Sequence, residues 1–289
     1  MNFIKYNILL ILLWGIVIDI TYAQAPSLKS ELALIENIKK WCRVEYGMDL
    51  SNNFYSKWSH NDNPFLYLYV SDKDSVAWVY PKINDPSNLL RIKDSLDRIG
   101  YHTLLYKTYG TSETLLTKHL LCFPIESILF IVFHEATHQV INKTSKIPYV
   151  FEEALCDLVG NYASIEYSRK FLTEDTSKVI KHIQYIEMVG KEINFCINQY
   201  QNSNGELDIN KLNSIIDNIK NSNVSLFLSE RYDYTINNAY LLRYNNYSKH
   251  YFLLKDLLIK LGGINNVLNF IRNLPDNELE CMRIIHKEI

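Results

Sequence analysis

Residues 125–142 read IESILFIVFHEATHQVIN, and the prediction of the fold starts from this stretch. Apolar side chains occupy most of its positions, as expected for a helix that is buried on nearly all sides. Pro124 precedes the stretch and suits the first position of a helix, because its missing N–H has no helical partner there. His134 and His138 are four residues apart, so their side chains project from the same face. We therefore expect a buried helix that carries two histidines side by side.

A histidine pair at this spacing is typical of a metal site. Two imidazoles one turn apart can bind a single Zn²⁺ ion, and Glu135 stands beside the first of them, where it can act on a water molecule. This is the H-E-x-x-H arrangement of zinc metalloproteases. Burying two histidines and a glutamate in so apolar a helix without a metal would cost free energy. We therefore predict one zinc ion held by His134 and His138, with Glu135 as the general base.

Zinc needs a third ligand from the protein, and residues 151–160, FEEALCDLVG, offer carboxylates on a second predicted helix. The metzincin motif is excluded, because Thr144 stands where that motif has its third histidine. Glu153 and Asp157 are four residues apart and share a face. We expect Glu153 to be the third ligand and Asp157 to accept the outer N–H of a ligating histidine. Glu152 points about 100° away; it is the alternative ligand, or else a solvated surface charge.

The remaining segments predict an α+β protein with a single domain over residues 24–289. Its front, residues 24–120, is expected to contain a few strands, and its back, residues 121–289, to be mostly helical and to carry the zinc site. Helical spacing and turn residues predict helices over 29–47 and 87–99, a hairpin over 65–80 and a strand over 101–108. Downstream, helices are predicted over 149–171, 176–202 and 208–221, with two or three more in the last fifty residues, interrupted at 262–263 and 275.

The first residues have the order of a secretory signal peptide. Lys5 precedes an apolar run over residues 8–18, and small residues lead to Ala23. The run is too short to span a hydrocarbon core, which needs about 20 residues. We predict a signal peptide over residues 1–23, with cleavage after Ala25 as the alternative. The mature chain is then expected to be periplasmic or secreted, without an integral membrane segment.

Composition excludes several other classes of protein. The 289 residues carry 30 Lys and Arg against 32 Asp and Glu, a net charge of −2 that does not suit a nucleic-acid binder. No G-x-x-x-x-G-K or G-x-G-x-x-G phosphate-binding motif is present. The five cysteines are widely spaced, and we expect mostly buried free thiols rather than a disulfide framework. They are Cys42, Cys122, Cys156, Cys196 and Cys281.

The two zinc motifs together resemble those of the gluzincins, the thermolysin-like zinc peptidases. These have a glutamate as third ligand and an E-x-x-x-D motif on the second helix, here EALCD over residues 153–157. The short gap between His138 and Glu153 looks more like a bacterial family of inferred aminopeptidases with an F-N-E-x-F-A element. Residues 151–156 match that element as FEEALC, with Glu152 in place of the usual asparagine.

The resemblance extends to both sides of the motifs. Residues 38–48, the L-x-R-I-G-Y element over 96–101 and the YGTS element over 109–112 look similar to the family's N-terminal half. The family's N-N-A-x-L segment corresponds to residues 237–241, followed by Tyr247 and an apolar helix. The resemblance implies a zincin-like fold, zinc-dependent peptidase activity, and Tyr247 as donor to the oxyanion of the reaction.

The function predicted on this basis is hydrolysis of peptide or protein substrates, with aminopeptidase action as one form of it. Two alternatives stay open: an exported zinc-containing binding protein without catalytic activity, and a metal-dependent hydrolase of a non-peptide amide. Asn238 and His250 are weaker candidates than Tyr247, and for both we favour a structural role. The other histidines are interpreted as surface or loop residues: His60, His102, His119, His182 and His286.

Overall fold

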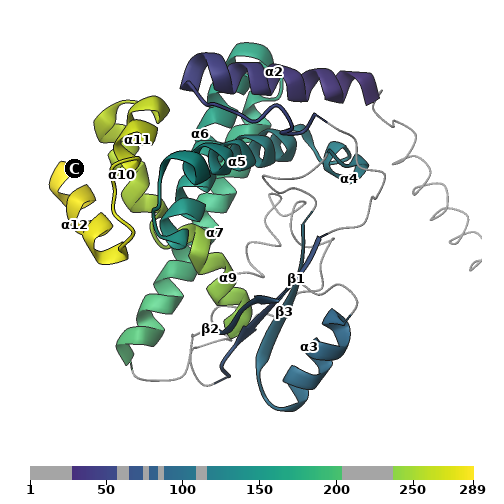
Figure 1. Cartoon of the computed structure of the whole chain (residues 1–289), viewed down its shortest axis with the longest axis vertical. Helices are drawn as coiled ribbons and strands as arrows, with labels where there is room; N and C mark the ends of the chain where they lie inside the picture. The colour runs from purple at the N-terminus through teal and green to yellow at the C-terminus, as the bar shows by residue number, and fades with distance from the viewer. Residues whose placement is uncertain (1–27, 57–64, 74–77, 84–87, 109–115, 204–236) are drawn as a thin grey trace, which may run out of the picture.

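The computed structural model describes residues 28–56, 65–73, 78–83, 88–108, 116–203 and 237–289 (Figure 1). The predicted signal peptide and the helix predicted over 208–221 lie outside the described residues. Within them the protein is mostly helical with a small sheet, which confirms the α+β class.

Two long helices form the centre of the molecule. Helix α5 (Ile125–Thr144) is the apolar helix of the sequence analysis, and α6 (Tyr149–Phe171) follows it after a short connection and packs along it. Figure 1 shows α2 (Leu28–Tyr46) crossing one end of this pair. The other helices in the described residues are α3 (Leu89–Arg98), α4 (Lys118–Leu121), α7 (Thr176–Ser203), α9 (Asn238–Ser248), α10 (Tyr251–Leu261), α11 (Ile264–Ile271) and α12 (Glu278–Glu288).

The sheet has three antiparallel strands in the order β2-β1-β3. They are β1 (Phe65–Ser71), β2 (Trp78–Ile83) and β3 (His102–Thr108), with β1 and β3 in register from Phe65–Thr108 to Ser71–His102. Side chains alternate between the two faces of a strand. Leu68 and Val70 accordingly pack on Leu89 of α3 (Leu89–Arg98), whereas Tyr69 joins the cluster around α7 and α9. The sheet is thus held between α3 and the helical body (Figure 1).

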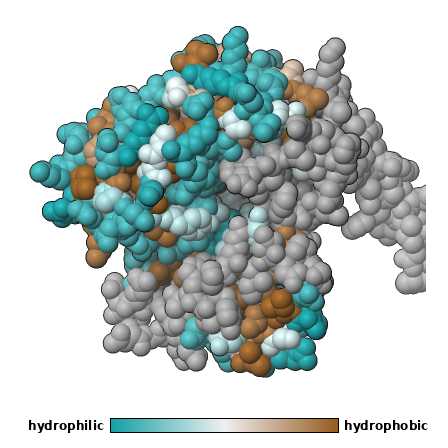
Figure 2. Space-filling model, in the orientation of Figure 1, coloured by the Kyte–Doolittle hydropathy of each residue, from teal (hydrophilic) through white to brown (hydrophobic). Residues whose placement is uncertain are grey.

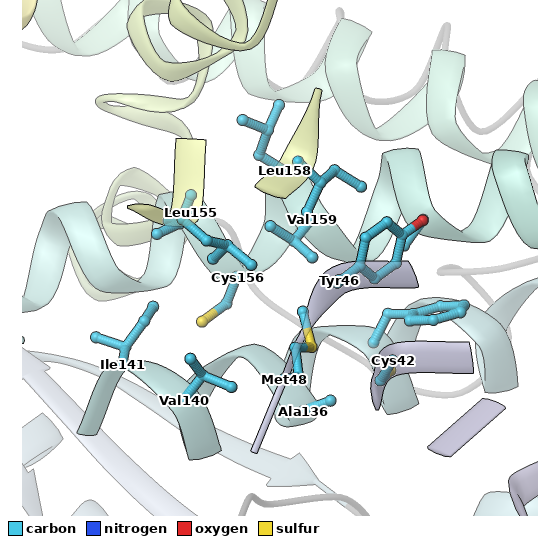
Figure 3. Close-up of a cluster of buried hydrophobic side chains, with 14 of the residues drawn as sticks. Cys42, Tyr46, Met48, Ala136, Val140, Ile141, Leu155, Cys156, Leu158 and Val159 are labelled. Atoms are coloured by element: carbon cyan, nitrogen blue, oxygen red, sulfur yellow. The ribbon is translucent and has the colours of Figure 1, made fainter. Parts of the chain in front are cut away.

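The main core lies where α2, α5 and α6 meet. Figure 3 shows side chains from all three segments interdigitating, among them Tyr46, Val140 and Leu155. Helices α5 and α6 approach closely at Gly160, where an added Cβ would lie 3.0–3.1 Å from the ring and carbonyl oxygen of Phe130. This close approach keeps the motif-bearing turns of the two helices side by side.

Most of the predicted elements are present, and two details differ. Pro124 stands at the N-cap of α5 rather than at its first helical position. At both positions a backbone N–H would have no partner within the helix, so its absence in proline costs no helical hydrogen bond. A helix the prediction did not delimit, α9, begins at Asn238, and the Asn237 side chain caps it by accepting a hydrogen bond from the Tyr240 N–H.

The cysteines and the surface follow the expectations from composition. Cys42, Cys156 and Cys281 are buried free thiols and Cys122 is an exposed one, as predicted. Figure 2 shows a mostly hydrophilic face, with hydrophobic surface gathered where Figure 1 places α3. None of the helices in the described part of the chain has the length and apolarity needed to cross a membrane.

Candidate metal centre

Helices α5 and α6 bring the predicted zinc ligands to one point. His134 and His138 stand one turn apart on α5, and their Nε2 atoms lie 3.1 Å from each other. Glu153, on the first turns of α6, places its Oε2 atom 3.6 Å from Nε2 of His134 and 3.7 Å from Nε2 of His138. The three side chains are at least four-fifths buried, so these atoms converge in a region with little access for solvent.

The outer nitrogens of both histidines face carboxylates. Nδ1 of His138 lies 2.6 Å from Oε1 of Glu152. Nδ1 of His134 lies 2.8 Å from Oδ1 of Asp157, although the alignment there falls short of a hydrogen bond. A carboxylate partner fixes the hydrogen of an imidazole on the nitrogen that faces it. Both Nε2 atoms then present lone pairs to each other and to Glu153.

Lone pairs that converge in this way repel one another unless a proton or a metal ion lies between them. Oε2 of Glu153 is fully enclosed and accepts no hydrogen bond from any described residue, which is costly for a buried charged oxygen unless a cation compensates it. Ligands about 2.0–2.1 Å from a zinc ion in tetrahedral positions are about 3.4 Å apart. The observed separations of 3.1–3.7 Å lie on both sides of that value. The donor set therefore fits a metal ion.

Cys156 is a further potential ligand on α6. Its Sγ and the nitrogens of His134 and His138 all lie within 4.8 Å of one another, so this buried group could hold a metal ion. Burial raises the pKa of the Cys156 thiol to about 12, despite the nearby His138. Figure 3 shows the Cys156 side chain directed from α6 toward α5 within the hydrophobic cluster. The cysteine was not predicted as a ligand.

Electrostatics in the centre favour an ionised glutamate. Burial by itself raises the pKa of Glu153, but the neighbouring histidines lower it to about 2. Burial likewise opposes the charged form of His138, but Cys156, Glu152 and Glu153 together raise the pKa of this histidine well above its usual value. A protonated His138 ring therefore faces the Glu153 carboxylate, and a metal ion would take over the charge that this proton otherwise supplies.

Glu135 follows His134 on α5 and is half-buried. Partial burial and the charge of Glu135 together raise the pKa of the Tyr67 phenol on β1. The predicted general base is therefore close enough to the sheet for its charge to act on Tyr67. Tyr67 was not predicted, because nothing in a strand sequence shows which helix its side chains will meet.

Tyr247 and Arg243 of α9 form another wall of the centre. The Tyr247 ring lies 6.2 Å from the His134 ring, measured between centroids, so the predicted oxyanion donor is placed at the site. The Arg243 guanidinium lies 3.8 Å from the centroid of that same ring. Arg243 was also missed by sequence reasoning. Its position one turn before Tyr247 on a largely buried helix was the signal that could have found it.

Several other candidates have structural roles. The Asn238 side chain donates to the carbonyls of Asp72 and Lys73 and ties α9 to the end of β1. His250 stacks on Phe151 with ring centroids 3.9 Å apart and pairs with Glu278. These contacts agree with the structural role expected for His250.

Three of the sequence interpretations need correction. His102 is a strand residue whose Nδ1 accepts the N–H of Asn238, and His182 lies against Phe130 in α5, so neither is a simple surface or loop residue. Glu152 binds the outer nitrogen of His138 rather than standing free in solvent, because α6 turns its first residues toward α5.

Comparison with known proteins adds nothing to this description: no protein-family model, no curated protein and no solved structure matches the chain.

Proposed function

We propose that this protein is a zinc-dependent peptidase of the gluzincin type, with a zincin-like fold. The observation that carries the proposal is the convergence of His134, His138 and Glu153, whose ligand atoms lie 3.1–3.7 Å apart. Zinc is the metal that this combination of imidazoles and carboxylate suits, and a fourth position left to water is the mark of a catalytic site. The resemblance of HEATH and EALCD to the gluzincin motifs supports the same conclusion.

Glu153 is a better third ligand than Cys156. The Glu153 carboxylate has a pKa of about 2 and is ionised at neutral pH, whereas the Cys156 thiol has a pKa of about 12. Binding through sulfur would first require loss of a proton from a thiol in an apolar cluster, which is unfavourable. Glu153 also has a buried oxygen without a hydrogen bond in the described structure, and a metal ion would satisfy it.

Each remaining residue of the centre has a defined task in hydrolysis. A zinc ion supplies Lewis acidity and lowers the pKa of water toward about 7. Glu135 removes the proton of the attacking water and later delivers it to the leaving amine. The Tyr247 hydroxyl makes no hydrogen bond to another described residue and is free to donate to the oxyanion that develops on the peptide carbonyl. Asp157 and Glu152 keep the two imidazoles oriented.

The proposal includes export and a peptide or protein substrate. Export is supported by the residue order of segment 1–23, which is that expected of a signal peptide and lies outside the described residues. Near-neutral charge and the absence of phosphate-binding motifs from the sequence argue against nucleic acid as the substrate.

A peptide-library digest with the zinc-loaded protein and its Glu135→Gln variant tests the proposal. The wild type is expected to cut peptides, and Glu135→Gln to keep its zinc while losing at least about 100-fold in rate, because the general base is gone. Full activity in Glu135→Gln would contradict the mechanism. Bound zinc without any cleavage would favour the non-catalytic binding protein or a hydrolase of another amide.

A further inference from the structure

Arg243 is a buried cation that interacts electrostatically with Glu153 and Asp157 of the centre but has no carboxylate of a described residue in direct contact. Its side chain is 7 % exposed, yet no carboxylate oxygen of a described residue lies within 4.0 Å of its guanidinium group. It donates no hydrogen bond to a described residue, and Nε is fully enclosed. A buried charge without a direct counter-charge is costly, so an anion bound beside the guanidinium group would be stabilised.

Three tyrosine rings from the sheet and α9 hold the guanidinium group in place. Its central carbon lies 3.8 Å from the ring centroid of Tyr247, 4.3 Å from that of Tyr106 and 5.6 Å from that of Tyr69. Stacking of this kind uses the faces of the planar group and leaves its N–H donors free at the edges. Nε is the only nitrogen of the Arg243 side chain that is fully enclosed without a hydrogen bond to a described residue. The two terminal nitrogens, Nη1 and Nη2, therefore keep contact with solvent. The two donors at that end form a fork that suits a carboxylate.

The position of Arg243 relative to the metal centre limits how far the anionic group of a substrate can lie from the bond that is cut. The guanidinium carbon is 3.8 Å from the Tyr247 ring centroid, which is 6.2 Å from the His134 centroid, so the carbon is at most 10.0 Å from His134. One extended peptide residue spans about 3.3–3.6 Å. An anionic group bound by Arg243 therefore belongs within two or three residues of the bond cut at the metal.

We propose that Arg243 binds the C-terminal carboxylate of the peptide substrate, so that the enzyme removes one to three residues from the C-terminal end. This inference rests on the proposed peptidase function and names its substrate class. A carboxylate supplies a counter-charge in direct contact and matches the fork of the guanidinium group. A positive group in this wall would in turn repel the free ammonium group that an aminopeptidase must bind.

The test compares two peptides that differ only at the C-terminus, acetyl-Phe-Leu-Ala as the free acid and as the amide. Binding is measured by calorimetry on zinc-loaded Glu135→Gln protein, so that turnover does not interfere. With Arg243 intact we expect the acid to bind at least about 30-fold more tightly than the amide, the size of effect seen for buried charge pairs. In Glu135→Gln/Arg243→Gln the ratio should fall to about one, and in Glu135→Gln/Arg243→Lys it should fall severalfold because the fork is lost.

Three results would overturn the inference. The first is equal affinity for acid and amide with Arg243 intact, and the second is no measurable binding of either peptide. The third is an acid preference that survives both Arg243 substitutions, which would place the carboxylate on the zinc instead. The Arg243→Lys protein keeps the charge and serves if Arg243→Gln does not fold. The acid preference can also depend on Arg243 while the wild-type protein cuts no peptide. That combination would contradict the proposed function but not the anion site.

Discussion

At the scale of single residues, the two carboxylates behind the histidines set the direction of the Nε2 lone pairs. Asp157 Oδ1 lies 2.8 Å from Nδ1 of His134, and Glu152 Oε1 lies 2.6 Å from Nδ1 of His138. Both carboxylates face the outer nitrogens rather than the Nε2 atoms. In the proposed zinc site their contribution would be orientation of the rings and choice of tautomer.

Asp157→Asn and Glu152→Gln should each weaken zinc binding about 10–100-fold, because an amide holds the imidazole less firmly and no longer enforces its tautomer. Competition with a chelator of known affinity measures the loss. Glu187→Gln is the matched control, since the contacts of Glu187 are with Lys255 and Tyr251 and not with the predicted ligands. Zinc affinity unchanged in both test variants would show that these carboxylates do not orient the ligands.

Tyr247→Phe separates the hydroxyl of this residue from its ring. The phenylalanine still stacks on Arg243, so the wall of the site stays in place, but the hydroxyl that we propose as donor to the oxyanion is lost. We expect an unchanged zinc content and a kcat lower by roughly 10²–10³, as for removal of one oxyanion donor. Tyr185→Phe, in the cluster between α7 and the sheet, is the control. A kcat equal to that of the wild type would remove Tyr247 from the mechanism.

At the scale of elements, the spacing of α5 and α6 determines whether the ligands meet. Residues from both helices form the centre, and the two helices pack tightly at Gly160, where a Cβ would meet the carbonyl oxygen of Phe130 at 3.1 Å. A backbone atom cannot move aside as a flexible side chain can. The interface therefore has little room for a larger residue at this position.

Gly160→Ala should lower the free energy of unfolding by about 1–3 kcal/mol, because it overpacks this contact. Urea unfolding followed by circular dichroism measures the change. Gly190→Ala is the matched control, since its added Cβ meets only the Cβ of Ser248, at 3.3 Å. A Gly160→Ala protein as stable as the wild type would show that α5 and α6 can separate without cost.

At the scale of the whole molecule, burial of His182 should link stability to pH. Burial lowers the pKa of this histidine to about 4, whereas an unfolded chain has a histidine pKa of about 6.5. The unfolded state then binds the proton more readily than the folded state. The stabilisation that comes from this difference is fully present above pH 6.5 and is lost as the pH falls toward 4.

The pH dependence of unfolding in wild type and His182→Gln measures this contribution. The free energy of unfolding of the wild type should decline between pH 6.5 and 4 more steeply than that of His182→Gln, which has no proton to bind there. Both curves should run parallel above pH 7. Identical slopes through the acid range would mean that His182 titrates alike in the folded and unfolded chain.

Local patterns in the sequence predict much of the fold and of the metal centre. The bounds of α6 and the i, i+4 pairs at His134 and His138 and at Glu153 and Asp157 follow from helical spacing, which needs no knowledge of tertiary structure. The contact of Glu152 with His138 and the place of Arg243 depend on how α6 and α9 are rotated against their neighbours. Tyr67, Tyr69 and Tyr106 reach the site only through the docking of the sheet, which no local pattern encodes.

The central claim is that His134, His138 and Glu153 hold one zinc ion in this protein. X-ray absorption at the zinc edge, on zinc-loaded protein with its metal content determined, tests it most directly. The account predicts one ion per chain, with nitrogen and oxygen neighbours at about 2.0–2.1 Å and no sulfur neighbour. A sulfur shell at about 2.3 Å would assign Cys156 as ligand in place of Glu153, and a protein that binds no zinc would contradict the account altogether.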